Sequence, residues 1–389
     1  MTGGGSGGHI TPILAIASEL KRQYPAVTIY YLGQRGDALA DVPAADPNID
    51  QVYTVSAGKL RRYADETWLQ RLLDVRTIAL NLRDVARILA GVWQSWRLLG
   101  KLQPDVIFTR GGFVSVPVAF GGRFRHIPYI THDSDSVPSL ANRLIASGAI
   151  KHAVALPPEV YPYPTAKTVM VGVPVSNHYQ PVTSTLQAQY RKEIDLKTDQ
   201  MVFVTGGGNG ARVLNQAVAD NARYLLGTFP DLTIVHVAGR SLENETNEAY
   251  DALGLGKARE RVQVHGFLTD LHRYSGAADI IIARGGATNL AEFALQRKAC
   301  LIVPSKQLSW NVQNAATLAE RKAIIQLTED QIEQPERLGR AIGDLLDHPL
   351  KRTELGNALA EYAHPNAAAE LAVLILETGE KEGHAGPKT

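Results

Sequence analysis

The feature that most constrains the fold is an alternation of short apolar runs with longer segments of helical periodicity. The runs occupy residues 27–32, 106–109, 129–131, 201–205, 233–238, 280–283 and 301–304. Most are apolar throughout, as in the strands of a parallel sheet that is covered on both faces. Helical patterns lie between them, at residues 13–23, 78–99, 212–226, 290–295 and 314–321. The alternation predicts an α/β fold with doubly wound parallel sheets.

The length of 389 residues is typical of two domains. The strand pattern pauses in a polar, proline-containing segment near residue 175, which predicts domains at 1–175 and 176–350. Residues 351–376 continue with helical patterns that we expect to pack back toward the N-terminal domain, and residues 377–389 are predicted to be disordered. A first strand should precede the glycines of residues 3–8, yet only Met1 and Thr2 do. We therefore expect a missing first strand or a start that lies upstream.

Composition argues against several classes of protein. With 40 Lys and Arg against 39 Asp and Glu, net charge favours no nucleic-acid partner. The single cysteine, Cys300, excludes a disulfide within the chain and a cysteine-ligated zinc site, and we interpret it as a buried, reduced thiol. No run resembles a membrane-spanning helix or an export signal. We expect a cytoplasmic protein that is soluble or lies on a membrane surface.

Four glycine-rich segments, at residues 3–9, 111–115, 206–212 and 284–292, each lead toward a helical pattern. Glycine lets the backbone approach an anion closely, and a helix N-terminus adds unpaired N–H groups. Each segment alone could be a linker or a tight turn. The third is neither a P-loop nor a clean dinucleotide fingerprint, which argues against hydride transfer. Glu292 lies one helical turn past the fourth turn, where it could accept two ribose hydroxyls or be an ordinary solvated residue.

In this order the segments resemble the MurG family of two-domain GT-B glycosyltransferases. The motifs that carry the resemblance are at residues 4–9, 111–115, 132–133, 171–174, 207–215 and 284–292, and the likeness extends from residue 3 to about 376. The resemblance implies two Rossmann-like domains with an interdomain cleft. The N-terminal domain would bind a lipid-linked sugar, and the C-terminal domain would bind a UDP-sugar.

The resemblance also implies an activity: inverting transfer of N-acetylglucosamine from UDP-N-acetylglucosamine to undecaprenyl-pyrophosphoryl-N-acetylmuramyl-pentapeptide. This hexosyltransferase step turns lipid I into lipid II during peptidoglycan synthesis, and so serves cell wall biogenesis, cell shape and division. UDP-N-acetylglucosamine is a co-substrate, and no other cofactor is expected. The expected location is peripheral, on the inner face of the cell membrane.

Site residues follow from the motifs. His9 is the best candidate by residue type for the base that deprotonates the acceptor hydroxyl. The acceptor-binding residues implied are Gly4, Gly5, Gly111, Gly112, Phe113, Ser115, His132 and Asp133. The donor-binding residues implied are Ser6, Gly7, Gly8, Asp135, Ser176, Gly207, Gly208, Asn209, Leu268, Arg284, Ala287, Thr288, Asn289, Leu290, Ala291, Glu292 and Asn311. Among them Leu268 would offer its backbone to uracil, and Glu292 would hold the ribose.

No metal site is expected. Helix N-termini and loop amides can stabilise a leaving diphosphate without a metal. Asp133 and Asp135 have the spacing of an Asp-x-Asp metal motif, but they align with the family's His-Glu segment instead.

The sequence departs from the family pattern at positions that recognise the donor sugar. A family asparagine is Asp135 here, and an acid beside a diphosphate-sugar is repulsive unless it is paired or contacts sugar hydroxyls. An arginine on the donor side of the family site is replaced here by Ser176, and a loop serine is replaced by Gly208. The family's paired glutamines align near Trp310 and Asn311. Three alternatives therefore stay open: a GT-B transferase with another UDP-sugar or lipid acceptor, a sugar-nucleotide epimerase, and a non-catalytic binder.

Residues 55–105 carry nine Lys and Arg against five Asp and Glu. One helical face would carry Arg76, Arg83, Arg87, Gln94, Arg97 and Lys101, and another Ile78, Leu82, Val85, Leu89, Val92, Trp96 and Leu99. Such a basic amphipathic helix can lie on an anionic membrane surface. The alternative is an ordinary helix that packs on the core by its apolar stripe.

Overall fold

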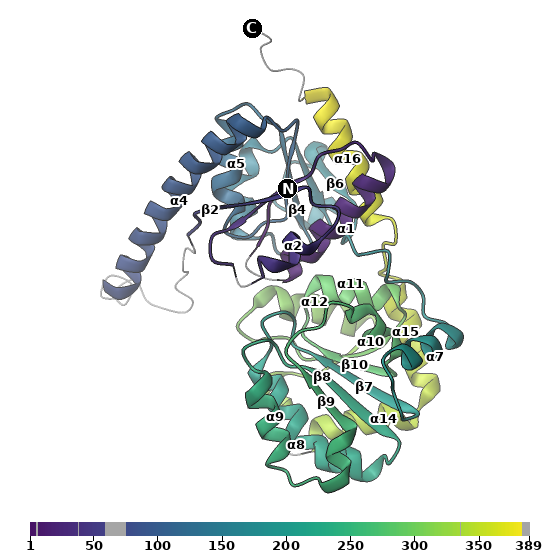
Figure 1. Ribbon diagram of the computed structural model, residues 1–389. Helices are drawn as coiled ribbons and strands as arrows, with labels where there is room; N and C mark the ends of the chain where they lie inside the picture. Colours follow the sequence, from purple (N-terminus) through teal and green to yellow (C-terminus); the bar gives the residue numbers. More distant parts are fainter. Residues whose placement is uncertain (5–6, 38, 59–74, 335, 383–389) are drawn as a thin grey trace. The chain divides into compact units, whose positions relative to one another are not determined.

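The computed structural model describes residues 1–4, 7–37, 39–58, 75–334 and 336–382. The chain divides into two compact units (Figure 1). Unit 1 comprises Met1–Ser176 with Asn366–Thr389, and unit 2 comprises Asn177–Pro365. Each unit is an α/β layer structure around a parallel sheet, which confirms the predicted fold class.

Unit 2 contains a six-stranded parallel sheet in the order β12-β11-β10-β7-β8-β9. Its strands are β7 (Gln200–Thr205), β8 (Leu232–Val237), β9 (Val262–His265), β10 (Ile280–Ala283), β11 (Ala299–Ile302) and β12 (Ile325–Gln326). The strand order reverses between β7 and β10, which pair directly, with Thr205 opposite Ala283. Ligands of doubly wound folds bind at the carboxyl ends of the strands where such a reversal occurs.

Helices cover both faces of the unit 2 sheet. They are α7 (Ser184–Glu193), α8 (Arg212–Thr228), α9 (Glu243–Asp251), α10 (Leu271–Ala277), α11 (Ala287–Leu295), α12 (Ser309–Glu320), α13 (Glu329–Ile332), α14 (Arg337–Asp347) and α15 (Pro349–Ala360). Val202 and Val204 face the core with α8 and α14, while Met201 and Phe203 face the core with α10, α11 and α12. Because successive residues of β7 are buried on opposite faces, its four central residues are all apolar.

Unit 1 contains the strand pair β1-β2 and the four strands β3-β4-β5-β6, all parallel. The strands are β1 (Tyr30–Gln34), β2 (Gln51–Val55), β3 (Ile107–Thr109), β4 (Tyr129–Asp133), β5 (Lys151–Val154) and β6 (Thr168–Met170). The helices are α1 (Gly7–Gln23), α2 (Asp41–Ala45), α4 (Val75–Leu102), α5 (Ser115–Arg123), α6 (Leu140–Ile145) and α16 (Ala367–Glu382). The core with α1 and α16 lies on one face, and the core with α4, α5 and α6 on the other.

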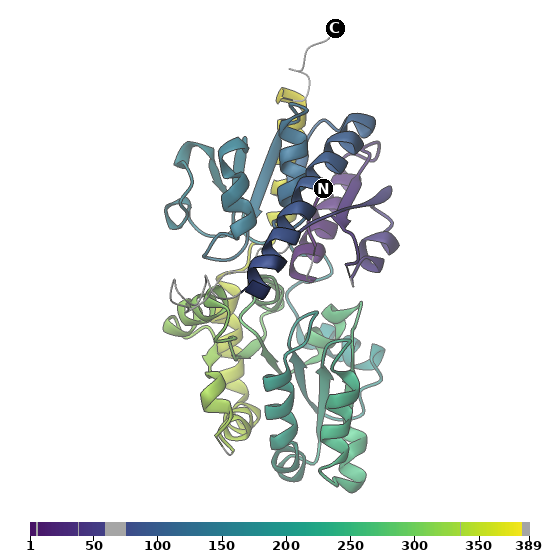
Figure 2. The same ribbon diagram turned by 90° about the vertical axis from the view of Figure 1, so that its left-hand side faces the viewer.

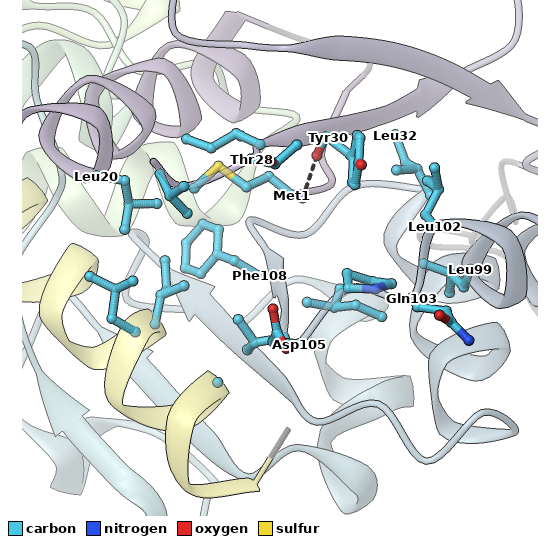
Figure 3. Close-up of a pocket in the computed structure, with 18 of the residues that line it drawn as sticks. Met1, Leu20, Thr28, Tyr30, Leu32, Leu99, Leu102, Gln103, Asp105 and Phe108 are labelled. Carbon is cyan, nitrogen blue, oxygen red and sulfur yellow. Dashed lines mark hydrogen bonds between the residues drawn. The ribbon is translucent and has the colours of Figure 1, made fainter. Parts of the chain in front are cut away.

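The beginning of the chain joins the two parts of the unit 1 sheet. Thr2 forms parallel bridges with Leu32 and with Thr109. Before this bridge, a cavity of about 460 Å³ separates β1 from β3 (Figure 3). The Met1 amino group donates a hydrogen bond to the Tyr30 carbonyl at 2.7 Å, and burial lowers its pKa to about 5. Thr2 thus lies at the position expected for a first strand, between β1 and β3.

The C-terminal segment differs from the prediction. Residues 351–376 were expected to pack together toward the N-terminal domain, but α15 belongs to unit 2, where it contacts β11 and α11. Only α16 returns to unit 1, where Leu371, Ala372 and Ile375 pack in the core with α1. Disorder from residue 377 was also wrong in part, because α16 continues to Glu382; residues 383–389 lie outside the described part of the chain.

Candidate functional site

Two glycine loops of unit 1 leave the sheet side by side. One follows Thr2 and the other follows β3, and Thr2 bridges to β3. Gly112 has a positive φ of 84°, and a Cβ there would lie 2.9 Å from the Gly4 carbonyl oxygen. Only glycine allows this contact between backbones. The structure therefore brings Gly4, Gly111 and Gly112 together, whereas Gly5 and Ser6 lie outside the described residues.

The second loop is held by its own hydrogen bonds. The Gly111 N–H donates to Thr109 Oγ1 at 3.1 Å, and the Ser115 hydroxyl donates to the Gly111 carbonyl at 2.6 Å. Ser115 is buried at the start of α5, while Phe113 is partly buried. The buried Ser115 side chain thus fixes the conformation of the loop. The backbone of the loop is left as the surface that can face a ligand.

His9 lies in the first turn of α1, after Gly7 and Gly8, and contacts the second loop. Its Nδ1 is 3.2 Å from the Arg110 carbonyl oxygen. A carbonyl only accepts, so Nδ1 carries the proton and Nε2 keeps a lone pair. Burial and the Arg110 charge lower the pKa of His9 to about 4. The ring is neutral at physiological pH, which is the form that can accept a proton.

Arg110 is a site residue that the sequence analysis missed. It joins β3 to Gly111, it is only 5% exposed, and its guanidinium contacts the Ser134 hydroxyl. The charges of Asp135 and Asp133 raise its pKa, while burial lowers it by more. The only signal in the sequence was a charged residue between an apolar strand and a glycine turn. Arg110 places a positive charge near Asp135, which answers the concern about an unpaired acid at that position.

His132 and Asp133, expected to bind the acceptor, are buried behind the loops. His132 Nε2 donates to the Gly172 carbonyl at 2.9 Å, and burial lowers its pKa to about 3. Asp133 accepts hydrogen bonds from the Ser139 N–H at 3.0 Å and from the Tyr163 hydroxyl at 2.7 Å. Burial raises the pKa of Asp133. The two side chains tie the end of β4 to its neighbours, and their exposed fractions are only 0% and 4%.

In unit 2 the loop after β7 has its glycines where the backbone requires them. Gly207 and Gly210 have positive φ values of 82° and 73°. A Cβ on Gly210 would lie 2.0 Å from the Ala238 carbonyl oxygen, whereas a Cβ on Gly207 would meet nothing within 4 Å. The Gly210 side is therefore packed against the segment after β8. The Gly207 side is open, and Gly208 and exposed Asn209 follow it toward α8.

The turn from β10 into α11 lies beside this loop, because β7 and β10 are neighbours. A Cβ on Gly285 would lie 2.5 Å from the Asn311 carbonyl oxygen, but Gly286 has open space around it. Helix α11 begins at Ala287 without a side-chain cap. The first-turn N–H groups of a helix have no acceptor inside the helix, and such groups are the usual anion-binding groups of a helix N-terminus.

Several donor-binding candidates have structural contacts instead. The Arg284 guanidinium pairs with Glu329 at 2.8 Å and donates to the Val303 carbonyl at 3.0 Å. Its charge is therefore directed at β11 and α13. The Leu290 side chain belongs to the core, and the Asn311 side chain is buried. Ala291 is partly exposed on α11, and Ser176 ends the first part of unit 1, where it is partly exposed.

Glu292 is not the solvated helix residue of the alternative interpretation. It is only 6% exposed and has a hydrogen bond with the Tyr179 side chain. Burial raises the pKa of Glu292 to about 8. Leu268, in the segment between β9 and α10, packs against the same core cluster as Leu290. Unit 2 thus packs Leu268 and Leu290 in one core cluster and places the two glycine turns at the strand reversal.

Metal binding has no preformed site in the ranges that the structure describes. No group of three or more His, Cys, Asp or Glu side chains there is arranged to hold an ion. The Asp133 carboxylate of the Asp-x-Asp spacing is already bound to Ser139 and Tyr163.

A second surface lies on α4, which runs along α5 (Figures 1 and 2). Its packing face carries Asp84, Gly91, Ser95 and Leu99, all buried. Most of the apolar stripe points outward instead. Its exposed members, with the neighbouring Trp93, are Leu82 (66%), Val85 (42%), Leu89 (66%), Trp93 (57%) and Trp96 (38%). The alternative of an ordinary helix packed by this stripe is therefore wrong for these residues.

Comparisons with known proteins were made for the whole chain. Family models for the glycosyltransferase family 28 N-terminal domain and C-terminal domain match residues 1–154 and 201–371. A relative from Natranaerobius thermophilus is 29% identical and covers 96% of this chain and 98% of its own. One from Clostridium botulinum is 32% identical and covers 85% of each. Both are named UDP-N-acetylglucosamine–N-acetylmuramyl-(pentapeptide) pyrophosphoryl-undecaprenol N-acetylglucosamine transferase.

Among solved structures, MurG of Acinetobacter baumannii is similar, with a TM-score of 0.67 and 23% identity. It covers 97% of this chain and 98% of its own. At this level of identity the likeness concerns the fold.

Proposed function

The chain belongs to the MurG family of glycosyltransferases, and we propose that it transfers N-acetylglucosamine from UDP-N-acetylglucosamine to undecaprenyl-pyrophosphoryl-N-acetylmuramyl-pentapeptide. The single observation that carries this function is the near full-length match to relatives of that name, at 29% identity over 96% of the chain. The product is the lipid-linked disaccharide used for peptidoglycan. Its supply serves the cell wall, cell shape and division.

Unit 2 is proposed to bind the UDP-sugar. Supporting this, the open glycine loop at Gly207 and the uncapped start of α11 lie at the point where the strand order reverses. Two sets of backbone N–H groups there can hold a diphosphate and stabilise the charge that develops on the leaving UDP. Glu292 would accept the ribose hydroxyls, and Leu268 would meet the uracil.

Unit 1 is proposed to bind the lipid-linked acceptor. The adjoining backbones at Gly4 and Gly112 would face its diphosphate, with the buried Arg110 charge adding attraction. His9, neutral and bonded through Nδ1, would take the proton of the acceptor hydroxyl at Nε2 while that oxygen attacks the anomeric carbon. Attack opposite the leaving UDP inverts the configuration.

The membrane face is proposed to be α4. Exposed Leu82, Leu89 and Trp93 lie beside basic side chains, and the Arg97 guanidinium lies 5.0 Å from the centre of the Trp93 ring. Within the described ranges, no helix is long and apolar enough to cross a bilayer. Surface binding of this kind would hold the enzyme where its lipid-linked acceptor lies, on the inner face of the membrane.

The test is a donor screen with purified protein, measuring UDP release with and without the lipid-linked muramyl acceptor. UDP-N-acetylglucosamine should turn over only when the acceptor is present. Turnover of another UDP-sugar, with none from this donor, would overturn the proposed sugar. Acceptor-independent epimerisation of the donor would favour an epimerase, and binding without turnover would favour a non-catalytic binder.

A His9 variant tests the proposed base directly. Replacing His9 by Ala should lower kcat by roughly 10²–10⁴-fold, because the proton of the attacking hydroxyl then has no acceptor. UDP-N-acetylglucosamine binding should be unchanged, since the residues proposed for it in unit 2 are untouched.

A further inference from the structure

Four buried polar side chains form a connected group between the end of β8, the start of α8 and helix α9. They are Asn215, His236, Thr246 and Tyr250, and none is more than 4% exposed. Helices α8 and α9 pack against each other beside this group (Figure 1). A buried polar side chain is costly unless its hydrogen bonds are satisfied, so the partners of each atom show what the group holds in place.

The direction of the hydrogen bonds made by Asn215 is determined by its partners. The Thr246 hydroxyl donates to the Leu242 carbonyl at 2.8 Å, so its oxygen can only accept from the Asn215 amide, 3.2 Å away. The same Asn215 Nδ2 donates to the Ala238 carbonyl at 3.0 Å. Because both contacts require the amide nitrogen, Asn215 Oδ1 is turned toward His236.

His236 and Tyr250 fix the other end of the Asn215 amide. An amide oxygen only accepts, so His236 Nε2, at 3.1 Å from Oδ1, carries the proton and donates. The other ring nitrogen, Nδ1, then has a lone pair that accepts from the Tyr250 hydroxyl at 2.9 Å. Burial lowers the pKa of His236 to about 3, so the ring keeps this neutral form at physiological pH. The hydrogen bonds thus run in one direction, from Tyr250 through His236 and Asn215 to the Ala238 carbonyl.

The Ala238 carbonyl is the point at which this group touches the proposed diphosphate loop. A Cβ on Gly210 would lie 2.0 Å from the carbonyl oxygen, and a Cβ on Gly239 would lie 2.6 Å from the Gly210 Cα. The Gly210 N–H in turn donates to the Gly207 carbonyl at 2.9 Å, which closes the turn whose open side is at Gly207. A displaced Ala238 carbonyl would therefore move the backbone that is proposed to face the diphosphate.

We propose that Asn215, oriented by His236 and Tyr250, is a positioning residue for the diphosphate of the UDP-sugar. Its amide fixes the Ala238 carbonyl, and this carbonyl fixes the glycine turn at residues 207–210 against the end of β8. The inference rests on the proposed function, in which this turn binds the diphosphate. Asn215 acts through the backbone and needs no contact with the nucleotide.

Helix α8 offers a matched control in Asn221, whose side chain is also buried, at 6% exposed. Its Nδ2 donates to the Ala217 carbonyl at 2.8 Å, and its Oδ1 accepts from the Gly339 N–H of α14 at 3.0 Å. Neither partner lies in the glycine turn or in the segment after β8. Asn215→Ala and Asn221→Ala therefore each remove a buried amide from the same helix, but only Asn215→Ala releases the Ala238 carbonyl.

The experiment measures the binding of UDP, and of uridine, which lacks the diphosphate, to the full chain by calorimetry. Asn215→Ala should weaken UDP binding about five- to tenfold, because the diphosphate must then order the turn that the amide held in place. Uridine binding should be unchanged. Asn221→Ala should lower the unfolding temperature about as much as Asn215→Ala does, but leave UDP affinity unchanged. Tyr250→Phe is a milder variant that removes only the far hydroxyl, and it should weaken UDP binding about two- to threefold.

Hydrogen exchange of the ligand-free protein gives a readout independent of binding. The Gly210 amide should exchange faster in Asn215→Ala than in the unchanged protein, and at the unchanged rate in Asn221→Ala. Unchanged UDP affinity or unchanged Gly210 exchange in Asn215→Ala would overturn the inference, as would an equal loss of UDP affinity in Asn221→Ala or an equal loss of uridine affinity in Asn215→Ala. If the unchanged protein itself binds UDP no more tightly than uridine, the proposed diphosphate contact of this turn is wrong, and Asn215 only supports the fold.

Discussion

At the scale of single residues, the two proposed sites share a feature that the glycine motifs do not reveal, namely a buried ionisable side chain. The pKa of this side chain is shifted by burial and by polar neighbours: that of Arg110 by Asp135 and Asp133 in unit 1, and that of Glu292 by Tyr179 in unit 2. Buried charges strengthen the electrostatics of a site and are costly when a partner is lost. Substitutions at such residues should therefore affect stability and pH dependence as well as activity.

Arg110→Met tests this for unit 1. Arg110 lowers the pKa of Asp133, against burial, which raises it. A carboxyl with a raised folded pKa costs stability once the pH exceeds its unfolded value, and losing Arg110 enlarges that cost. We expect a loss of roughly 3 kcal/mol in unfolding free energy at about pH 8 and a smaller loss at about pH 5, measured by urea unfolding.

The matched control is Arg123→Met, which removes an exposed arginine of α5 in the same unit. It should change the unfolding free energy by less than about 0.5 kcal/mol at both pH values. A loss in Arg110→Met that is equal at the two pH values would show that packing, and not charge, explains the effect.

At the scale of elements, α4 differs from an ordinary amphipathic helix because small residues bring it close to its neighbours. A Cβ on Gly91 would lie 1.9 Å from the Ser56 carbonyl oxygen, and Ser95 faces Gly121 of α5. This close packing leaves the larger apolar side chains Leu89 and Trp93 outside the core. Gly91 and Ser95 are thus buried, while Leu89 and Trp93 between and beside them are exposed.

If α4 lies on the membrane, Leu89→Gln with Trp93→Gln should reduce sedimentation with anionic liposomes severalfold, because apolar burial drives such binding. Donor binding should not change. Leu350→Gln, at a 79% exposed leucine of α15 in unit 2, is the control and should bind liposomes normally. Equal binding by the double variant and the control would exclude α4 as the membrane face. Binding should also fall as salt rises.

The cavity beside Met1 makes a second prediction for an element. Its lining includes Leu32, Leu99 and Phe108, between the edges of β1 and β3 (Figure 3). Adding about five Val and Ile residues before Met1 should raise the unfolding temperature, because the added strand pairs with both edges, fills apolar space and removes the buried amino group. An added stretch of Gly and Ser of equal length is the control. The same change in unfolding temperature with both additions would contradict the prediction.

At the scale of the whole molecule, the chain crosses between the units twice. Unit 1 is completed by α16, whose Leu371 is fully buried against α1. Unit 2 is continuous in sequence and has its own core on both faces of its sheet. The two units should therefore respond separately to core substitutions.

Leu371→Ala should destabilise unit 1 by about 2–5 kcal/mol through the cavity it leaves. Affinity for UDP-N-acetylglucosamine, measured well below the unfolding temperature, should be unchanged, and the donor should still stabilise unit 2. Val373→Ala, on the same helix but 43% exposed, should have little effect. Lost donor affinity in Leu371→Ala would show that the units do not act independently.

The sequence by itself determined the fold class, most of the strands and the order of the glycine turns. Those signals are local: an apolar run such as residues 201–205 must be buried on both faces, and glycines before a helix start leave few backbone alternatives. The strands β2, β5, β6, β9 and β12 escaped prediction. β6 has three residues and β12 has two, and polar residues interrupt β2, β5 and β9, so none of the five is a continuous apolar run.

Only the tertiary structure decided which groups meet. The contact of Gly4 with Gly112 and the bond of Tyr179 to Glu292 each join residues more than 100 positions apart, and Asp135 and the Arg110 charge that compensates it lie on different strand ends. The outward direction of Leu89 and Trp93 likewise depends on what packs against Gly91. Periodicity shows that a helix has an apolar stripe, but the size of the residues on its other face decides which face is buried.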